Sequence, residues 1–482
     1  MPTTTPNDES HIHLTTREQL PLAIALEHLK DSVKAIRRSL PYHKAQKAQV
    51  ITCVEAIEPI EPLHWLYVQQ LYPRLYWKNR EQNNEVAAVG IADSFTAKDD
   101  DNNNSAFAAF QAACDERSPA LRYFGGFRFN GAELSEEHWK HFPPFFFFLP
   151  LVTVERFADQ RYTVSANLFL AVGDSVDEKI NQLIAFIEQL NSRIDNESVL
   201  NTLLPSVEHI TRTPNKAAWN AGCEKALNAF ENGELEKIML ARQTTLRFTH
   251  TFSPLLFLLR YPYPHNAIYR FYLELAPNQA FFSFTPERLF RRHESMVETE
   301  ALAGTCSKEL LQATDQHASQ TLLGSEKDVR EHNYVREMIY QELLPICSSI
   351  DMEDEVQVLQ LQRLAHLYTR CSATLKEKSI PTSDILKQLH PTPAVGGVPK
   401  EEILEHIRAL EPFTRGWYAA PVGWVDSHHA EFAVAIRSGL VNGNEVHLYS
   451  GAGLVKGSNP DAEWEEIEQK IGDLLSITRM KQ

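Results

Sequence analysis

The sequence predicts a mixed α/β fold of the α+β kind, folded as one large body. Single strands rich in aromatic and β-branched residues alternate with helices, which argues against a sandwich or a helix bundle. The chain has 482 residues, of which 43% are hydrophobic and 23% are charged. This composition excludes a disordered, collagen-like or coiled-coil chain, and the length suffices for one large core or two ordinary ones.

The order of the elements divides the chain in two. Residues 1–18 are polar and are expected to form a flexible tail. From residue 19 the sequence shows mixed helical and strand patterns. Past Pro205 and Pro214 the pattern changes to short strands, glycine-containing turns and strongly patterned helices. We therefore expect an N-terminal half, 19–210, followed by a catalytic region, 211–482, that carries nearly all of the informative residues.

Two elements of the N-terminal half are well defined by their patterns. Residues 144–157 (PFFFFLPLVTVERF) are rich in aromatic and β-branched side chains, which predicts a buried strand that breaks at Pro150. Between Asp177 and Asn191, isoleucine and leucine recur at helical spacing and predict an amphipathic helix. We expect both elements to serve the core.

The helix expected after Pro460 carries charged residues on the face that should be buried. One stripe of this helix contains Glu463, Glu466, Ile467, Lys470, Ile471 and Leu474. These acids could simply favour the positive end of the helix dipole, although Asp461 alone would do so without charging the apolar stripe. Structural and functional roles therefore both stay open for these acids.

A second helix, expected over 325–344, repeats this pattern, because Glu331 shares a stripe with Tyr334, Val335 and Met338. Unpaired carboxylates on buried faces are costly, so two such helices facing each other would form a site for a hard cation. The absence of a nearby His or Cys cluster favours Mg²⁺ over zinc.

Charge and targeting signals limit the partners. The chain carries 47 Lys and Arg against 63 Asp and Glu, a net charge of −16, and it has no basic run that could follow a phosphate backbone. We therefore expect no nucleic-acid partner. Six scattered cysteines without a CxxC pair indicate a reducing compartment. Because no signal peptide or long apolar window occurs, we expect a cytoplasmic protein with no membrane partner.

Searches for nucleotide and hydrolase motifs fail. The sequence contains no GxxxxGK[ST], HExxH or GxSxG pattern. Gly451 and Gly453 follow a strand-like segment but do not complete GxGxxG. Their amides could approach a substrate carboxylate, and an ordinary tight turn is equally compatible with the pattern.

Seven ordered motifs of the catalytic region nevertheless form a recognisable set. They are EKIMLAR (236–242), FSFTPERL (282–289), TEALAGT (299–305), SEKDVREH (325–332), LHPTPAVGG (389–397), PFTRGWY (412–418) and YSGAGLVKGSNPDAEWEEIEQK (449–470). In their order and spacing the sequence resembles the chorismate-utilising enzymes, and within them most closely the isochorismate synthases of the menaquinone branch. The resemblance implies one body of two antiparallel sheets with helices packed outside.

The resemblance also implies an activity, which is the Mg²⁺-dependent isomerisation of chorismate to isochorismate. Water would add at C2 and the C4 hydroxyl would leave, with Lys237 as the base and Glu287 as the acid. The implied Mg²⁺ ligands are Glu331 and Glu466, with Glu463 beside them. The implied substrate-binding residues are Gly304, His390, Arg437, Tyr449, Gly451, Gly453 and Lys470.

Relatives within the family offer alternatives. Ala303 replaces the nucleophilic lysine of aminodeoxychorismate synthases, and Lys237 replaces the glutamine of anthranilate synthases. An anthranilate synthase component is therefore disfavoured, and no obligatory amidotransferase partner is expected. Salicylate synthase and a siderophore-branch isochorismate synthase remain the alternatives. The sequence departs from many relatives at Ser283 and Ala420, which stand where glycine is common, and either residue could narrow the pocket.

Overall fold

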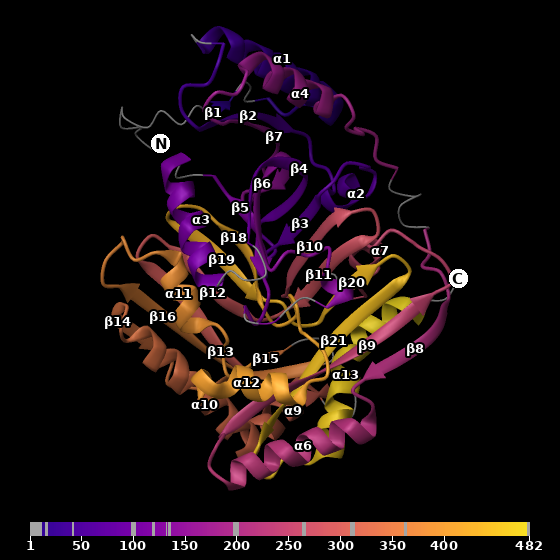
Figure 1. Ribbon diagram of the computed structural model, residues 1–482, viewed down its shortest axis with the longest axis vertical. Helices are drawn as coiled ribbons and strands as arrows, with labels where there is room; N and C mark the ends of the chain where they lie inside the picture. Colours follow the sequence, from indigo (N-terminus) through magenta and orange to yellow (C-terminus); the bar gives the residue numbers. More distant parts are fainter. Residues whose placement is uncertain are drawn as a thin grey trace.

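The computed structural model describes most of the chain (Figure 1). The described residues are 12–14, 18–40, 43–97, 103–117, 121–131, 133, 136–195, 202–262, 267–308, 314–360 and 364–479. Within these ranges no helix is both long enough and apolar enough to cross a membrane.

The N-terminal half consists mainly of strands. They are β1 (Ile12–Leu14), β2 (Gln49–Ile57), β3 (Arg74–Lys78), β4 (Glu85–Thr96), β5 (Tyr123–Phe127), β6 (Phe145–Arg156), β7 (Tyr162–Leu170) and β8 (Val207–Thr213). β2 alternates buried and half-buried residues over most of its length, which is the pattern of a strand with one face in the core. β6 is buried almost throughout, and it pairs along both edges.

Strands also dominate the catalytic region. They are β9 (Lys237–Phe248), β10 (Tyr269–Ala276), β11 (Gln279–Thr285), β12 (Arg288–His293), β13 (Met296–Ser307), β14 (Cys347–Met352), β15 (Gln357–Gln360), β16 (Leu364–Leu375), β17 (Gly397–Val398), β18 (Pro421–Val425), β19 (His429–Val434), β20 (Ser438–Asn442) and β21 (Glu445–Val455).

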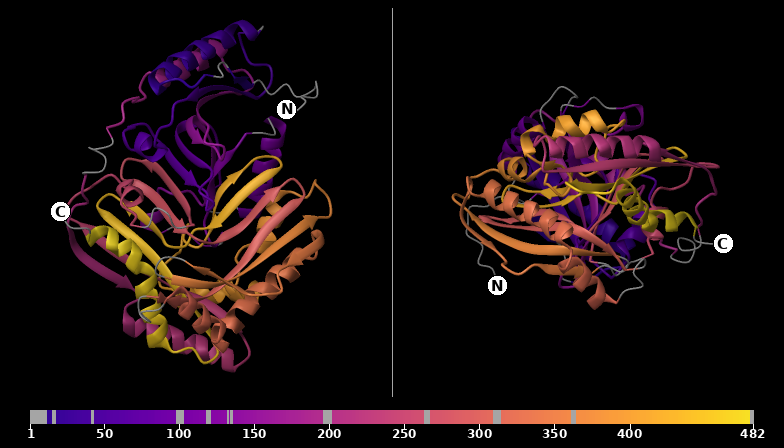
Figure 2. Two further views of the ribbon diagram at one scale, coloured as in Figure 1. Left: turned by 180° about the vertical axis from the view of Figure 1, so that it is seen from behind. Right: turned by 90° about the horizontal axis from the view of Figure 1, so that it is seen from below.

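The strands form one continuous sheet that forks at β6 into two antiparallel arms. From one edge of β6 the first arm runs through β4, β3, β10, β11, β20, β21, β9 and β8. From the other edge the second arm runs through β5, β18, β19, β12, β13 and β16. Figure 2 (left) shows the two arms spreading apart below the N-terminal strands. This confirms the prediction of two antiparallel sheets in one body.

Helices lie outside the strands (Figures 1 and 2). They are α1 (Leu22–Ser39), α2 (Pro62–Tyr67), α3 (Asn103–Arg117), α4 (Val176–Ile187), α6 (Lys216–Glu231), α7 (Leu256–Leu259), α9 (Asp315–Leu323), α10 (Glu326–Leu343), α11 (Thr382–Leu389), α12 (Lys400–Leu410) and α13 (Pro460–Arg479). α1 and α4 cover β2 and β7, and α6 and α13 cover β21. α10 contacts β13 and β16 of the second arm and β21 of the first, so it bridges the arms near the site.

Local sequence explains where the two helices of the site begin. α10 starts after Ser325, whose hydroxyl accepts a hydrogen bond from the Asp328 amide over 3.3 Å, as an N-cap residue does. α13 starts at Pro460, where the fixed φ of proline suits the first helical turn. On α13, Glu463, Ile467 and Ile471 are all buried, which confirms that charged and apolar residues share the inner face.

The structure corrects two expectations about the N-terminal half. Residues 1–11 and 15–17 of the predicted tail lie outside the described residues, but Ile12–Leu14 pair in parallel with β2. The predicted break at Pro150 does not occur, because β6 continues through it. The irregularity falls instead on the neighbouring strand, where the register shifts between Ile91 and Asp93.

The predicted boundary near residue 210 does not separate the strands in space. β3 of the N-terminal half pairs with β10 of the catalytic region, and β5 pairs with β18. The two larger apolar clusters of the body each contain residues from both halves of the chain.

Candidate active site

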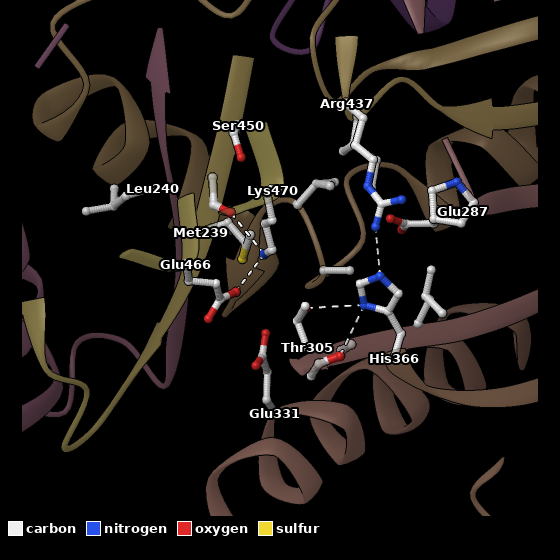
Figure 3. A pocket seen from close by; sticks show the side chains of 18 of the residues that line it. Met239, Leu240, Glu287, Thr305, Glu331, His366, Arg437, Ser450, Glu466 and Lys470 are labelled. Atoms are coloured by element: carbon white, nitrogen blue, oxygen red, sulfur yellow. Dashed lines mark hydrogen bonds and ion pairs between the residues drawn. The ribbon is translucent and has the colours of Figure 1, made fainter. Parts of the chain in front are cut away.

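A cavity lies where the two arms and the helices α10 and α13 meet. Its empty space is about 740 Å³ with the open mouth included. Most of the residues predicted from the sequence line it, namely Glu287, Gly304, Glu331, Arg437, Gly451, Glu466 and Lys470. In Figure 3, Glu287 and Arg437 lie on one side of the cavity and Glu466 and Lys470 on the other, with Glu331 below.

Lys237 does not line the cavity itself, but it contacts Glu331, which does. It is the first residue of β9, its side chain is 0% exposed, and its Nζ lies 2.9 Å from Oε1 of Glu331. Burial alone would raise the pKa of Glu331, but the Lys237 ammonium and its hydrogen bond hold that pKa below its ordinary value. The predicted base and a predicted metal ligand are therefore in direct contact.

Two further ion pairs flank this contact. Nζ of Lys470 lies 2.7 Å from Oε1 of Glu466, one turn away on α13, and it also donates to the Gly451 carbonyl over 3.1 Å. Nζ of Lys327 on α10 lies 2.5 Å from Oε1 of Glu463 on α13. Each predicted metal ligand is thus neutralised by one ammonium group.

Glu463 is the strongest indication of a cation site. It is 1% exposed, and its Oε2 is buried without a hydrogen-bond partner. Burial, and next the negative charge of Glu466, raise the pKa of Glu463 to about 7. Within the described ranges no three His, Cys, Asp or Glu side chains already converge as a ligand set. The carboxylate oxygens nevertheless suit Mg²⁺, which would give the orphaned oxygen the positive partner it lacks.

Glu287 sits at the crossing between the arms. It lies in the turn between β11, which ends at Thr285 in the first arm, and β12, which starts at Arg288 in the second. Burial, and next the negative charge of Glu300, raise the pKa of Glu287 to about 8. Thr392 donates a long hydrogen bond of 3.5 Å to its carboxyl group. Glu287 therefore keeps its proton at neutral pH, as predicted for a buried acid.

Arg437 is held by a residue that the sequence reasoning missed. Its Nη2 donates to Nε2 of His366 over 2.9 Å, which makes that nitrogen an acceptor. Nδ1 of His366 therefore carries the hydrogen and donates to the Gly304 carbonyl over 3.3 Å. Burial lowers the pKa of His366 well below its ordinary value, and the charge of Arg437 acts in the same direction. The neutral imidazole orients the guanidinium toward the cavity (Figure 3).

The glycines of the site allow close approach. A Cβ at Gly453 would lie 2.5 Å from Oε1 of Glu331, and a Cβ at Gly451 would lie 3.0 Å from the Tyr418 hydroxyl. Gly304 has φ +76°, a conformation that side chains disfavour. Gly453 is thus required beside the carboxylate of α10, although it does not itself line the cavity.

Besides Gly453, two further predicted substrate-binding residues, His390 and Tyr449, lie outside the cavity lining. Nε2 of His390 donates to the Phe129 carbonyl over 3.1 Å, and burial lowers the pKa of His390 to about 3. Tyr449 stacks on Tyr418 with ring centroids 5.3 Å apart, and Tyr418 stands between it and the cavity. His390 therefore braces a turn and Tyr449 supports the wall from behind, which corrects the expectation of direct contact.

The two departures from the family pattern do not narrow the cavity. Ser283 on β11 donates through its hydroxyl to the Ile436 carbonyl over 2.7 Å, and Ala420 is fully buried. Neither residue is part of the lining. Tyr418 and Arg415 do line it and were not singled out, because single aromatic and basic residues carry no distinctive spacing.

The chain is similar to known proteins over most of its length. A family model described as chorismate binding enzyme matches residues 33–479. Isochorismate synthase MenF of Escherichia coli (strain K12) is 32% identical over 87% of this chain and 91% of its own length. The salicylate biosynthesis isochorismate synthase of Pseudomonas aeruginosa is 32% identical over 73% of each protein. The solved structure of MenF, the menaquinone-specific isochorismate synthase from E. coli, superposes with a TM-score of 0.80 at 28% identity, covering 95% of this chain and 100% of that one.

Proposed function

This chain belongs to the family of chorismate-binding enzymes, and we propose that it isomerises chorismate to isochorismate for menaquinone biosynthesis. The observation that carries the proposal is a protonated Glu287 in the lining of the cavity, with the buried Lys237 in contact with Glu331 of the same lining. The E. coli menaquinone-specific isochorismate synthase, matched over its full length, supports this branch.

The reaction needs a base and an acid, because water is a poor nucleophile and hydroxide a poor leaving group. Lys237 takes a proton from water as the oxygen bonds to C2, the double bonds shift, and the C4–O bond breaks. Glu287 gives its proton to the departing oxygen, so one water enters and one leaves. Each group contributes about 10²- to 10⁴-fold to the rate. The pKa of Glu287, raised to about 8 mainly by burial, supplies the acid form; Lys237 acts as the base in its neutral amine form, after its ammonium group has given up a proton.

Binding of the two substrate carboxylates is assigned to opposite sides of the cavity. Glu331 and Glu466, with Glu463 beside them, would hold Mg²⁺, which supplies positive charge to one carboxylate when bound. Arg437, oriented by His366, offers a forked donor for the other carboxylate. The amides near Gly451 and Gly453 and the Lys470 ammonium are further donors.

Incubation of the pure chain with chorismate and Mg²⁺ tests this function. We expect isochorismate as the product, without salicylate or pyruvate, identified by chromatography and mass spectrometry. Release of pyruvate with salicylate would instead establish a salicylate synthase. The relative from P. aeruginosa, named for salicylate biosynthesis, makes a siderophore-type role the second candidate, and complementation of a strain lacking menaquinone synthesis separates the branches.

Removal of the metal tests the proposed Mg²⁺ site. Chelation with EDTA should lower kcat by about 100-fold or more, because several kcal/mol of charge stabilisation are lost. Added Mg²⁺ should restore the rate. Glu463→Gln should weaken Mg²⁺ binding measured by calorimetry, because the unpaired buried oxygen of Glu463 would no longer be anionic. Full activity in EDTA would remove these three glutamates from a metal site.

The proposal also covers location and partners. All six cysteines are free and buried, which fits the reducing cytoplasm. We propose that the chain acts there without an amidotransferase, since water and not ammonia is its nucleophile. Ammonia-dependent formation of anthranilate by the pure chain would contradict this.

A further inference from the structure

The turn that carries Glu287 is tied down on both sides by one ion pair. Nη1 of Arg80 donates to the Pro286 carbonyl, just before Glu287, over 2.9 Å. The Arg288 amide, just after Glu287, donates to Oε1 of Glu300 over 3.0 Å. The Arg80 guanidinium in turn grips both oxygens of Glu300, at 2.5 and 2.7 Å.

The two partners come from different arms of the sheet. Arg80 lies in the turn between β3 and β4 of the first arm, and Glu300 lies on β13 of the second. The side chains are 10% and 1% exposed, respectively. The pair therefore crosses from one arm to the other at the place where the chain itself crosses, between β11 and β12. A forked Arg–carboxylate contact of this kind fixes orientation as well as charge.

The charges that act on Glu287 come from three elements. Glu300 on β13 raises the pKa of Glu287, second only to burial, whereas Lys237 on β9 and Lys470 on α13 lower it. The Thr392 hydroxyl also lowers it through its hydrogen bond.

Four more charged groups face the same cavity, and one of them is Arg415. Arg437, Glu331 and Glu466 line it together with Glu287. The negative charge of Glu300 raises the pKa of Glu287 and so opposes the positive charges of Lys237 and Lys470.

We propose that the Arg80–Glu300 pair is a positioning device for Glu287, which holds the turn in place and fixes the negative charge beside the carboxyl group. The inference rests on the proposed function, in which Glu287 is the acid. It separates two roles. Arg80 orients the turn through its fork, while Glu300 supplies the charge that keeps the proton on Glu287.

Two variants separate these roles. In Glu300→Gln a like charge is lost, so the pKa of Glu287 should fall and the alkaline limb of the kcat profile should move down by about one pH unit. In Arg80→Lys the charge stays but the fork is lost. We expect kcat to fall about tenfold, with KM and the alkaline limb unchanged.

The matched control is Glu274→Gln. Glu274 forms an equally buried pair with Arg74, at 2.5 Å and with 4% and 1% exposure, which also joins the two halves of the chain. On β10 it pairs with Ala280, at the end of the β10–β11 pair opposite to Thr285 and the turn, and it does not line the cavity, so the control should leave the alkaline limb in place. The proposal is overturned if the alkaline limb of the kcat profile does not move in Glu300→Gln. It is also overturned if Glu274→Gln moves that limb by the same amount.

An infrared titration of the Glu287 carboxyl, assigned by its loss in Glu287→Gln, gives a readout that needs no turnover. The protonated band should persist to about one pH unit higher in wild type than in Glu300→Gln. If wild type makes no isochorismate, the proposed function fails, while this band still decides whether Glu300 sets the proton affinity of Glu287. An unchanged band overturns the inference even if isochorismate is formed.

Discussion

Lys237 and Glu287 are both buried, but the structure gives their loss different consequences for stability. Lys237 neutralises Glu331 over 2.9 Å, whereas Glu287 already carries its own proton at neutral pH because its pKa is raised to about 8. Removing Lys237 leaves a buried carboxylate without its partner. Replacing Glu287 by glutamine preserves both shape and charge.

We therefore expect Glu287→Gln and Lys237→Ala to lower kcat by about 10²- to 10⁴-fold each. Glu287→Gln should leave the free energy of unfolding at pH 7 nearly unchanged. Lys237→Ala should lower that free energy by about 3 kcal/mol, because it breaks a buried ion pair. Steady-state kinetics and urea unfolding measure the two effects. A near-normal rate in either variant would contradict its assigned role.

At this scale the sequence was most informative where a residue conflicts with its surroundings. Glu463 and Glu466 were recognisable because acids interrupt an apolar stripe; Glu466 lines the cavity, and Glu463 is buried on the same helix without lining it. His366 carries no such conflict, since a histidine inside a strand is ordinary. Its contact with Arg437 joins residues 71 positions apart and is not visible in any local pattern.

The site depends on how closely α10 approaches β21. Glu331 on α10 reaches the strand at Gly453, where a Cβ would lie 2.5 Å from its Oε1 and 2.9 Å from Sδ of Met239. Glu331 and Met239 both line the cavity, so neither is an exposed side chain that could simply move aside. Any side chain at position 453 must push the carboxylate away from Lys237.

Gly453→Ala should therefore lower kcat/KM by about tenfold or more, since a small misplacement of a site residue costs about 10²-fold. The matched control is Gly222→Ala in α6, where a Cβ would meet nothing within 4 Å. That variant should keep full activity and gain about 0.5–1 kcal/mol of stability. Kinetics and thermal unfolding of both variants check this, and an active Gly453→Ala enzyme would show that Glu331 has room to move.

Element patterns were predictable wherever the period was clear. The helical spacing between Asp177 and Asn191 corresponds to α4, and the aromatic run from residue 144 corresponds to β6. The proline rule failed at Pro150, because β6 absorbs the irregularity through a register shift on its neighbour β4. A partner strand's adjustment cannot be deduced from the strand that carries the proline.

At the scale of the whole molecule, the forked sheet could not be deduced from local patterns. β5 pairs with β18 about 300 residues later, and β3 pairs with β10 about 200 residues later. The family resemblance supplied the two sheets, but not their common origin at β6. Composition alone supported only a large mixed body, because pairing between distant strands depends on register and not on propensity.

The fork has a consequence for how this protein can be cut or recombined. Both arms start from the two edges of a single strand in the N-terminal half. A fragment that starts after residue 210 would therefore lack β3 and β5, and the backbone N–H and C=O groups at the exposed edges of β10 and β18 would have no partner strand. Gene segments exchanged between homologues must therefore carry β3, β5 and β6 together with the strands they border. The N-terminal half, to which no catalytic residue is assigned, thus supplies the strands on which the catalytic region assembles.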